Sequence, residues 1–213
     1  MAASVALDLA GEPMVLFAER ALFWPRRARL LIADLHLGKT DAFRRAGIGL
    51  PRGGTAHDLA RLTALVEATG ARELWILGDV LHGAVRGEDW QQSWHDWRAR
   101  HPQLALAALA GNHDRALAGA GLGLALLGEA VDDPPFAFRH EPTPHPRLHV
   151  VCGHVHPVLA LPGSTRRWPV FWLRAGMIVL PAFAAFTGGW AIALNAGERA
   201  ALCGPDAIAL LPG

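Results

Sequence analysis

The first half of the chain alternates between short apolar runs and longer segments with helical periodicity. Residues 15–17 and 21–24 flank a short turn and predict a hairpin, and residues 29–33, 73–77 and 104–110 predict further strands. Residues 55–69 and 89–100 carry the spacing of helices. Thr55 and Asp58 fit the start of the first helix, and Gly70 fits its end. This half therefore predicts strands that alternate with helices.

The helical periodicity fades beyond Gly111, and apolar runs dominate the second half. Residues 135–139, 148–151, 169–173 and 177–180 predict strands. Helices with strands in one half and strands alone in the other predict an α/β fold with two packed, mixed sheets flanked by helices. Because no repeat or low-complexity linker divides the 213 residues, we expect a single domain over residues 1–213.

One uncharged stretch, residues 175–194, has the length of a membrane span. Pro181 and the pair Gly188-Gly189 interrupt it, and residues 177–180 have the pattern of a buried strand. We therefore expect two core strands here, and no membrane partner.

Composition indicates a globular protein without a strong charge bias. Hydrophobic residues make up 52% of the chain and charged residues 18%, and the formal net charge is +1. Cys152 and Cys203 form no disulfide framework, and Cys152 has the pattern of a small buried residue. Asp8 lies in the N-terminal apolar stretch, which argues against a secretory signal. We expect a cytoplasmic location.

Four apolar runs lead into clusters of Asp, Asn or His. Ligands bind outside the carboxyl ends of strands in open α/β sheets, so we expect these clusters to converge. The i, i+2 spacing within two of them predicts side chains on the same side of an extended backbone. Glycines before Asp79, Asn112 and His154 permit tight turns or close backbone approach. The clusters are Asp34-Leu35-His36, Gly78-Asp79, Gly111-Asn112-His113-Asp114 and Gly153-His154-Val155-His156.

In this order, and with a separate histidine before the last, these clusters resemble the motifs of the calcineurin-like metallophosphoesterase superfamily. That resemblance implies a four-layer αββα sandwich. A narrower resemblance is to the bacterial ligase-associated DNA damage response endonucleases, PdeM. It rests on residues 33–39, Phe43-Arg44, residues 78–82, residues 140–142, and residues 180–183 and 186–189. One departure is His82, at a position where the superfamily often has Asp or Asn.

The resemblance implies two metal ions bridged by Asp79. One ion would be bound by Asp34, His36, Asp79 and His156, and the other by Asp79, Asn112, His140 and His154. Imidazole, carboxylate and amide ligands without thiolate favour Mn, Fe, Co, Ni or Zn over Mg or Ca. The resemblance points to Mn, and to a hydroxide shared by the two ions as the nucleophile.

The separate histidine has three candidates. We prefer His140 to His145 and His149 because it directly follows an apolar run. His113, next to a ligand, is placed to donate a proton to the leaving oxygen, and Asp114 to orient its imidazole.

Basic residues gather in the expected loop after the first motif. Contact with a nucleic-acid backbone and an ordinary solvated surface both fit this cluster. The stripe of Trp90, Trp94 and Trp97 suits base stacking, although a core-facing stripe is favoured. The basic residues are Lys39, Arg44, Arg45 and Arg52, with Arg115 further along the chain.

The resulting hypothesis is a metal-dependent phosphodiesterase that cleaves DNA in repair. By resemblance the DNA is single-stranded, and a repair ligase, helicase or exonuclease are the implied partners. One alternative is a small-molecule nucleotide phosphoesterase, which would not need Arg44 and Arg45. The other is a non-catalytic protein-binding scaffold, against which the presence of all seven ligands argues.

Overall fold

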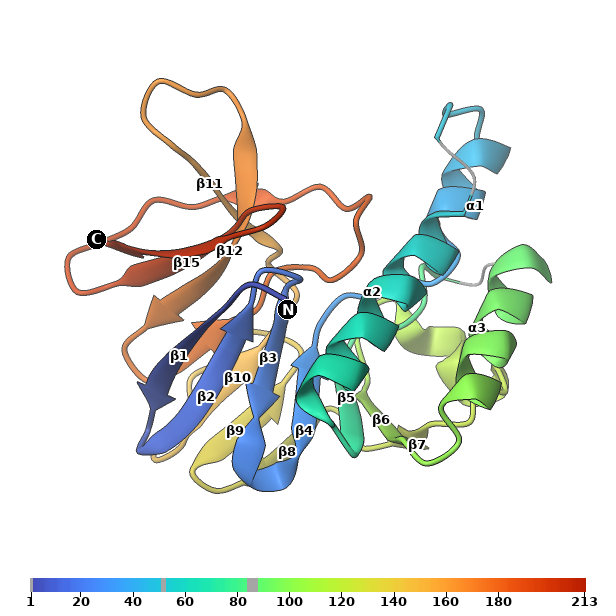
Figure 1. The fold of residues 1–213 in the computed structure, drawn as a ribbon, viewed down its shortest axis with the longest axis horizontal. Coiled ribbons are helices and arrows are strands. Elements are labelled where there is room, and N and C mark those ends of the chain that lie inside the picture. Colours follow the sequence, from blue (N-terminus) through green and yellow to red (C-terminus); the bar gives the residue numbers. More distant parts are fainter. Residues whose placement is uncertain (1, 51–52, 84–87) are drawn as a thin grey trace.

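Two mixed β-sheets pack face to face (Figure 1). The structure is a computed structural model and describes residues 2–50, 53–83 and 88–213. In the first sheet, β1 to β4 are antiparallel and β4 to β7 are parallel. Its seven strands, in spatial order, are β1 (Ser4–Leu9), β2 (Glu12–Phe17), β3 (Ala21–Trp24), β4 (Arg29–Ile32), β5 (Glu73–Leu77), β6 (Ala105–Leu109) and β7 (Ala125–Leu126).

In the described part of the chain, the second sheet has nine strands and comes from the second half of the sequence. Parallel strands β9, β10 and β13 lie near its centre, and antiparallel strands flank them. The strands are β14 (Trp190–Ala191), β11 (Pro157–Ala160), β12 (Arg167–Arg174), β13 (Met177–Val179), β10 (His149–Cys152), β9 (Phe136–Arg139) and β8 (Ala130–Asp133), with β15 (Arg199–Cys203) paired to β12 and β16 (Ile208–Pro212) paired to β15.

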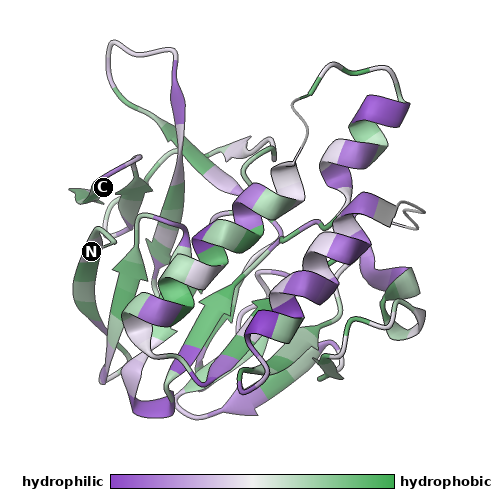
Figure 2. Ribbon diagram, turned by 45° about the vertical axis from the view of Figure 1, so that its right-hand side comes forward, coloured by the Kyte–Doolittle hydropathy of each residue, from purple (hydrophilic) through white to green (hydrophobic). Residues whose placement is uncertain are grey.

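Helices cover the outer face of the first sheet. In the described residues α2 (Gly54–Thr69) and α3 (Glu88–Arg100) provide this cover, and the chain also forms α1 (Lys39–Arg45) and the 3-10 turns η1 (Pro25–Arg27) and η2 (Asp114–Gly119). Leu62 of α2 and Trp94 of α3 share a core with Ile76 of β5. Figure 2 shows helices of mixed polarity lying over strongly hydrophobic strands. The predicted α/β class, with two mixed sheets flanked by helices, is confirmed.

Strand β4 is buried on both faces, because it lies between the helices and the second sheet. Leu30 and Ile32 belong to the core under the helices, whereas Leu31 joins the core between the sheets with Phe136 and Phe171. All four β4 residues are buried. A strand covered on both sides reads as a continuous apolar run, which is the pattern of residues 30–33.

The structure corrects three local predictions. The segment after the first motif is helix α1 and not a loop. Thr55 does not cap α2, whose preceding residue is Gly53 in a left-handed conformation. Asp58 instead accepts hydrogen bonds from Arg61 and from the backbone of Ala185.

The N-terminal strand and the uncharged stretch at residues 175–194 both lie within the sheets. Strand β1, which the apolar pattern did not predict, pairs with β2. Residues 175–194 contain β13 and β14, and no helix in the described part of the chain is long and apolar enough to cross a membrane. Arg52 lies outside the described residues.

The tryptophan stripe on α3 is core, as favoured, and does not provide a base-stacking surface. Trp94 and Trp97 are fully buried and Trp90 is 2% exposed. The indole N–H of Trp94 donates to the carbonyl of Leu122 at 2.9 Å, and that of Trp97 donates to Thr63 Oγ1 at 3.0 Å.

Trp94→Ala should therefore lower the free energy of unfolding by about 3–5 kcal/mol, because it leaves a cavity and an unpaired carbonyl. Urea unfolding monitored by circular dichroism measures the change. Trp190, which is 72% exposed, provides the matched control, and Trp190→Ala should stay within about 0.5 kcal/mol of the parent. Equal losses in the two variants would contradict this account of α3.

Candidate metal centre

The predicted ligands meet at one edge of the two sheets, where the parallel strands end. Asp34 follows β4 and Asp79 follows β5, which pair in parallel. His140 follows β9 and His154 follows β10, a second parallel pair. A bridge between Ala33 and Ala182 joins the two sheets at this edge. The predicted convergence of these strand ends is confirmed.

The ligand atoms form two groups that share Asp79. In each group, one atom per residue lies within 4.8 Å of the corresponding atom of every other member. The first group is Asp34, His36, Asp79 and His156, and the second is Asp79, His140 and His154. These are the two predicted sets except for Asn112, an amide. His145 and His149 belong to neither group, which favours His140 as the separate histidine.

The backbone at these residues is left-handed, and the predicted extended conformation is wrong. Five of the eight non-glycine residues with positive φ in the described part of the chain are predicted ligands. Such conformations cost on the order of 1–3 kcal/mol each and occur at sites that the surrounding structure holds in place. Backbone hydrogen bonds hold this site: Asp34 N donates to Gly78 O at 3.2 Å, and His36 N to Asp79 O at 2.9 Å. The five residues are Asp34, His36, Asp79, His154 and His156, with φ between 47° and 68°.

Glycines at the strand ends allow the loops to approach closely. Gly78 has a φ of 83°, and a Cβ there would collide with the ring of His140. A Cβ at Gly111 would collide with the backbone nitrogen of Asp79, and one at Gly153 with Ala33. The expected close approach is therefore present before all three motifs.

Two histidines have their tautomers set by backbone carbonyls. His140 Nδ1 lies 2.9 Å from Leu77 O, and His156 Nδ1 lies 3.2 Å from Gly188 O. Each Nδ1 must carry a proton in these bonds, so Nε2 is the ring nitrogen that can offer a lone pair to a metal ion. His140 Nε2 lies 3.6 Å from Asp79 Oδ1, and His156 Nε2 lies 3.3 Å from Asp34 Oδ1. A histidine whose Nδ1 donates to a backbone carbonyl while its Nε2 faces the site has the usual arrangement of a metal ligand, so these residues fit a metal site.

The remaining imidazoles of the two groups are consistent with metal binding. His36 Nε2 lies 3.4 Å from His156 Nε2, and His154 Nδ1 lies 3.1 Å from His140 Nε2. Burial, followed by the ammonium of Lys39, lowers the pKa of His36 to about 2. His36 is therefore neutral at physiological pH, which is the form that binds a metal ion.

Asn112 is exposed at the rim of the second group, and its amide is oriented by a neighbour. Its Nδ2 donates to Glu141 Oε1 at 3.2 Å, which leaves the Asn112 carbonyl oxygen free to bind a cation. The role of Glu141 was missed at the sequence level, although its position directly after His140 is a usable indication.

His113 lies beside the two groups and is open to solvent. Its side chain is 50% exposed, with Nε2 at 4.0 Å from Asp79 Oδ2. Its backbone N–H donates to Asp79 Oδ1 at 3.0 Å. The ring of His82 stacks on that of His113 with an interplanar angle of 24° and also meets the edge of His36. His82, the departure from the superfamily pattern, therefore joins His36 and His113 in a cluster of three imidazoles. The sequence did not predict this cluster.

Asp114 does not orient His113, so that part of the prediction is wrong. Its buried carboxylate accepts backbone N–H bonds from Val80, Leu81 and Gly111 at 2.9–3.2 Å. Those bonds fasten the loop after β5 to the loop after β6. Burial raises the pKa of Asp114, partly offset by the same backbone bonds. Asp114 thus supports the loop that carries Asp79.

The predicted basic residues lie in different environments. Lys39 is half-buried and donates to Thr187 Oγ1 at 3.1 Å, and burial lowers its pKa. Arg44 pairs with Asp41 at 2.7 Å within α1, whereas Arg45 on the same helix is exposed. Arg115 is exposed and lines a hollow together with Asn112 and His113. Arg115 therefore adjoins both His113 and a predicted ligand.

The two cysteines are free and buried, as expected for a chain without a disulfide framework. Burial raises the pKa of both thiols to about 12.

Comparison with known proteins identifies the family. The family model of calcineurin-like phosphoesterases matches residues 29–172. Among solved structures, the Pseudomonas putida nuclease MPE is 36% identical with a TM-score of 0.85, and the match covers 98% of this chain and 100% of that one. A weaker likeness is to Yfce, a phosphoesterase from E. coli, at 16% identity and a TM-score of 0.48 over 86% of this chain and 97% of that one. No curated protein matches by sequence. This chain therefore belongs to the calcineurin-like phosphoesterase family.

Proposed function

We propose that this metallophosphoesterase is a dinuclear-metal-dependent phosphodiesterase that hydrolyses single-stranded DNA. The observation that carries the proposal is the pair of ligand groups sharing one buried carboxylate, Asp79. A shared carboxylate lets two divalent cations lie close together, because it offsets part of their mutual repulsion. The nuclease likeness supports a nucleic-acid substrate.

The seven proposed ligands divide as the geometry groups them. Asp34, His36, Asp79 and His156 would hold one ion, and Asp79, His140 and His154 together with Asn112 would hold the other. Ions bound there would neutralise phosphate charge and make water a stronger nucleophile near neutral pH. The donor set contains no thiolate, which favours a transition metal, and we propose Mn.

His113 is the proposed proton donor to the leaving oxygen. Its ring is half exposed next to the ligand groups and is held by stacking against His82. Histidine is the side chain that most often transfers protons in enzymes near neutral pH. Arg115, on the same hollow, would attract the phosphate of the substrate.

The DNA assignment is tested with Mn-supplemented protein on three substrates: single-stranded DNA, duplex DNA and a chromogenic phosphodiester. We expect hydrolysis of the diester and internal cleavage of single-stranded DNA, both abolished by a chelator. Hydrolysis of the diester without cleavage of either DNA would instead favour the small-molecule phosphoesterase. As part of the same proposal, the protein acts in DNA repair and in the cytoplasm.

Arg44 and Arg45 on α1 are the proposed contacts to the DNA backbone. Arg44→Ala/Arg45→Ala should weaken DNA cleavage and flatten its salt dependence, because fewer phosphate contacts release fewer counterions. Arg45 should account for most of the loss, since Arg44 already pairs with Asp41. Hydrolysis of the chromogenic diester should barely change.

The measurement is the ratio of the two activities at two salt concentrations, for the parent and the double variant. An equal fall in both activities would assign these arginines to folding. No change in either would mean that the DNA is held elsewhere.

A further inference from the structure

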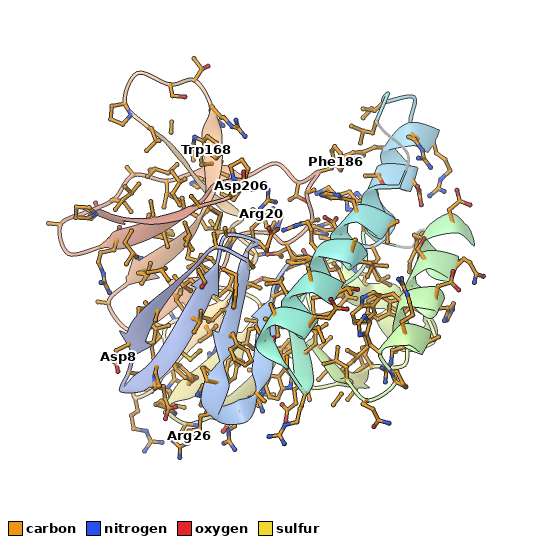
Figure 3. All side chains as sticks on the ribbon, viewed as in Figure 1. Asp8, Arg20, Arg26, Trp168, Phe186 and Asp206 are labelled. Carbon is orange, nitrogen blue, oxygen red and sulfur yellow. The ribbon has the colours of Figure 1, made fainter. Side chains whose placement is uncertain are left out.

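A large basic cavity adjoins the metal centre and is not explained by the chemistry proposed there. Its volume is about 580 Å³, and its walls come from the β2–β3 turn, α2, the β11–β12 hairpin, residues 185–189 and the β15–β16 turn. Figure 3 labels Trp168 on the protruding β11–β12 hairpin and Arg20 between that hairpin and α2. Four arginines line it, namely Arg20, Arg61, Arg166 and Arg167, against one carboxylate, Glu19.

Among the described residues, three of these arginines have no carboxylate partner. Arg61 is neutralised by Asp58 and Glu19 at 2.9–3.0 Å. Within residues 2–50, 53–83 and 88–213, no carboxylate lies within 4.0 Å of the guanidinium nitrogens of Arg20, Arg166 or Arg167. In a chain of formal net charge +1, such a concentration of unpaired cations marks a site for an anion.

Arg20 forms part of the cavity floor under constraint. Its backbone φ is 67°, a conformation that costs a non-glycine residue free energy. Its guanidinium donates through Nη1 to the carbonyls of Ala182 and Ala184, at 3.3 and 3.1 Å. Burial and the neighbouring Arg61 lower the pKa of Arg20. An anion in the cavity would relieve this unfavourable burial of charge.

The cavity and the metal centre share one wall. Gly188 lines the cavity, and its carbonyl accepts the hydrogen bond from His156 Nδ1 at 3.2 Å. Thr187 also lines it and accepts a hydrogen bond from Lys39, the residue that follows the first motif by three positions. A chain molecule bound at the metal ions therefore reaches the cavity by crossing residues 187–188, whereas a small ester does not.

The opposite flank of the metal centre has the reverse charge. There a cavity of about 370 Å³ beside Asn112 and His140 is lined by Glu129, Glu141 and a single arginine, Arg139. A polyanion is disfavoured inside that cavity. The substrate should therefore extend from the metal ions toward His156 and Gly188.

From this geometry we infer that the cavity bounded by Arg20, Arg166 and Arg167 is a second phosphate-binding subsite. It holds the backbone of the single-stranded DNA on the His156 side of the cleaved bond. This inference rests on the proposed function. It adds the path that the DNA follows from the metal ions, and it explains why the enzyme would prefer a polymer to a small ester. Arg166 lies over the ring of Trp168, with its guanidinium carbon 3.7 Å from the ring centre, which holds the arginine at the cavity rim.

The test compares two double variants that remove the same charge. Arg166→Ala/Arg167→Ala changes exposed residues of the cavity, and Arg72→Ala/Arg199→Ala changes exposed arginines at the far edge of the sheets. Binding of fluorescent single-stranded DNA to each Mn-loaded protein is measured by anisotropy across a salt series. Cleavage of the same DNA and of a chromogenic diester is measured in parallel.

We expect the cavity variant to bind DNA on the order of 10-fold more weakly, because it loses charge-assisted phosphate contacts. Its salt slope should fall by about 1.4, which corresponds to two contacts to a single strand. The control variant and the chromogenic activity should match the parent. Equal DNA affinity of the two double variants would overturn the subsite. If the parent binds DNA at the cavity but never cleaves it, the subsite stands and the proposed function fails.

Discussion

Asp79→Ala should abolish phosphodiesterase activity and metal binding more completely than any other single substitution at the site. Asp79 is the one residue common to both ligand groups, and it is 3% exposed. Its loss would leave Asp34, in the first group, as the one carboxylate of the two ligand groups, so the repulsion between two divalent cations is largely uncompensated. The same change removes the acceptor of the backbone hydrogen bond from His113.

Metal content by elemental analysis, measured with turnover on the chromogenic diester, tests this expectation. His156→Ala provides the matched comparison, because it removes a ligand from the first group alone. It should retain the ion of the second group. An Asp79→Ala protein that keeps most of its metal and activity would contradict the shared assignment.

His113→Ala should leave the metal content unchanged and slow DNA cleavage by roughly 10²–10⁴-fold, the usual contribution of a positioned general acid. The half-exposed ring of His113 lies next to the ligand groups without belonging to either. A nitrophenyl diester has a leaving group that needs no proton, so the defect on that substrate should be smaller.

The control is His145→Ala. His145 Nδ1 accepts the backbone N–H of Leu148 at 2.9 Å, and this residue lies outside both groups. Its activity should match the parent. Loss of metal from His113→Ala would show that His113 is a ligand, and an equal defect on both substrates would remove its role as proton donor.

The role of Asp114 could not be predicted from its residue type and its position next to His113. An aspartate next to a catalytic histidine suggests a partner for the imidazole, and this assignment used only proximity in the sequence. The carboxylate instead meets three backbone N–H groups, two of them from residues more than thirty positions away. No local pattern reports such contacts, because they depend on how the loops after β5 and β6 pack together.

The environments of the basic residues also do not follow their spacing in the sequence. Arg44 and Arg45 are adjacent in sequence, yet one is paired with Asp41 and the other is exposed. Arg20 and Arg167 are far apart in sequence and line the same cavity. Charge clusters in a folded chain are set by tertiary neighbours, so sequence proximity located only part of the basic surface.

The sequence by itself determined the fold class and the chemical identity of the proposed ligands. A strand buried between two layers needs apolar side chains, so apolar runs mark strands in the sequence. The polar residues that end those runs then lie at the strand termini. Tertiary structure decided the left-handed backbone at five ligands and the orientation of the rings of His140 and His156. Those features arise from contacts between distant segments, such as Leu77 with His140 and Gly188 with His156. A carbonyl from another strand selects which ring nitrogen is left to bind a metal, and only the folded chain brings that carbonyl within reach.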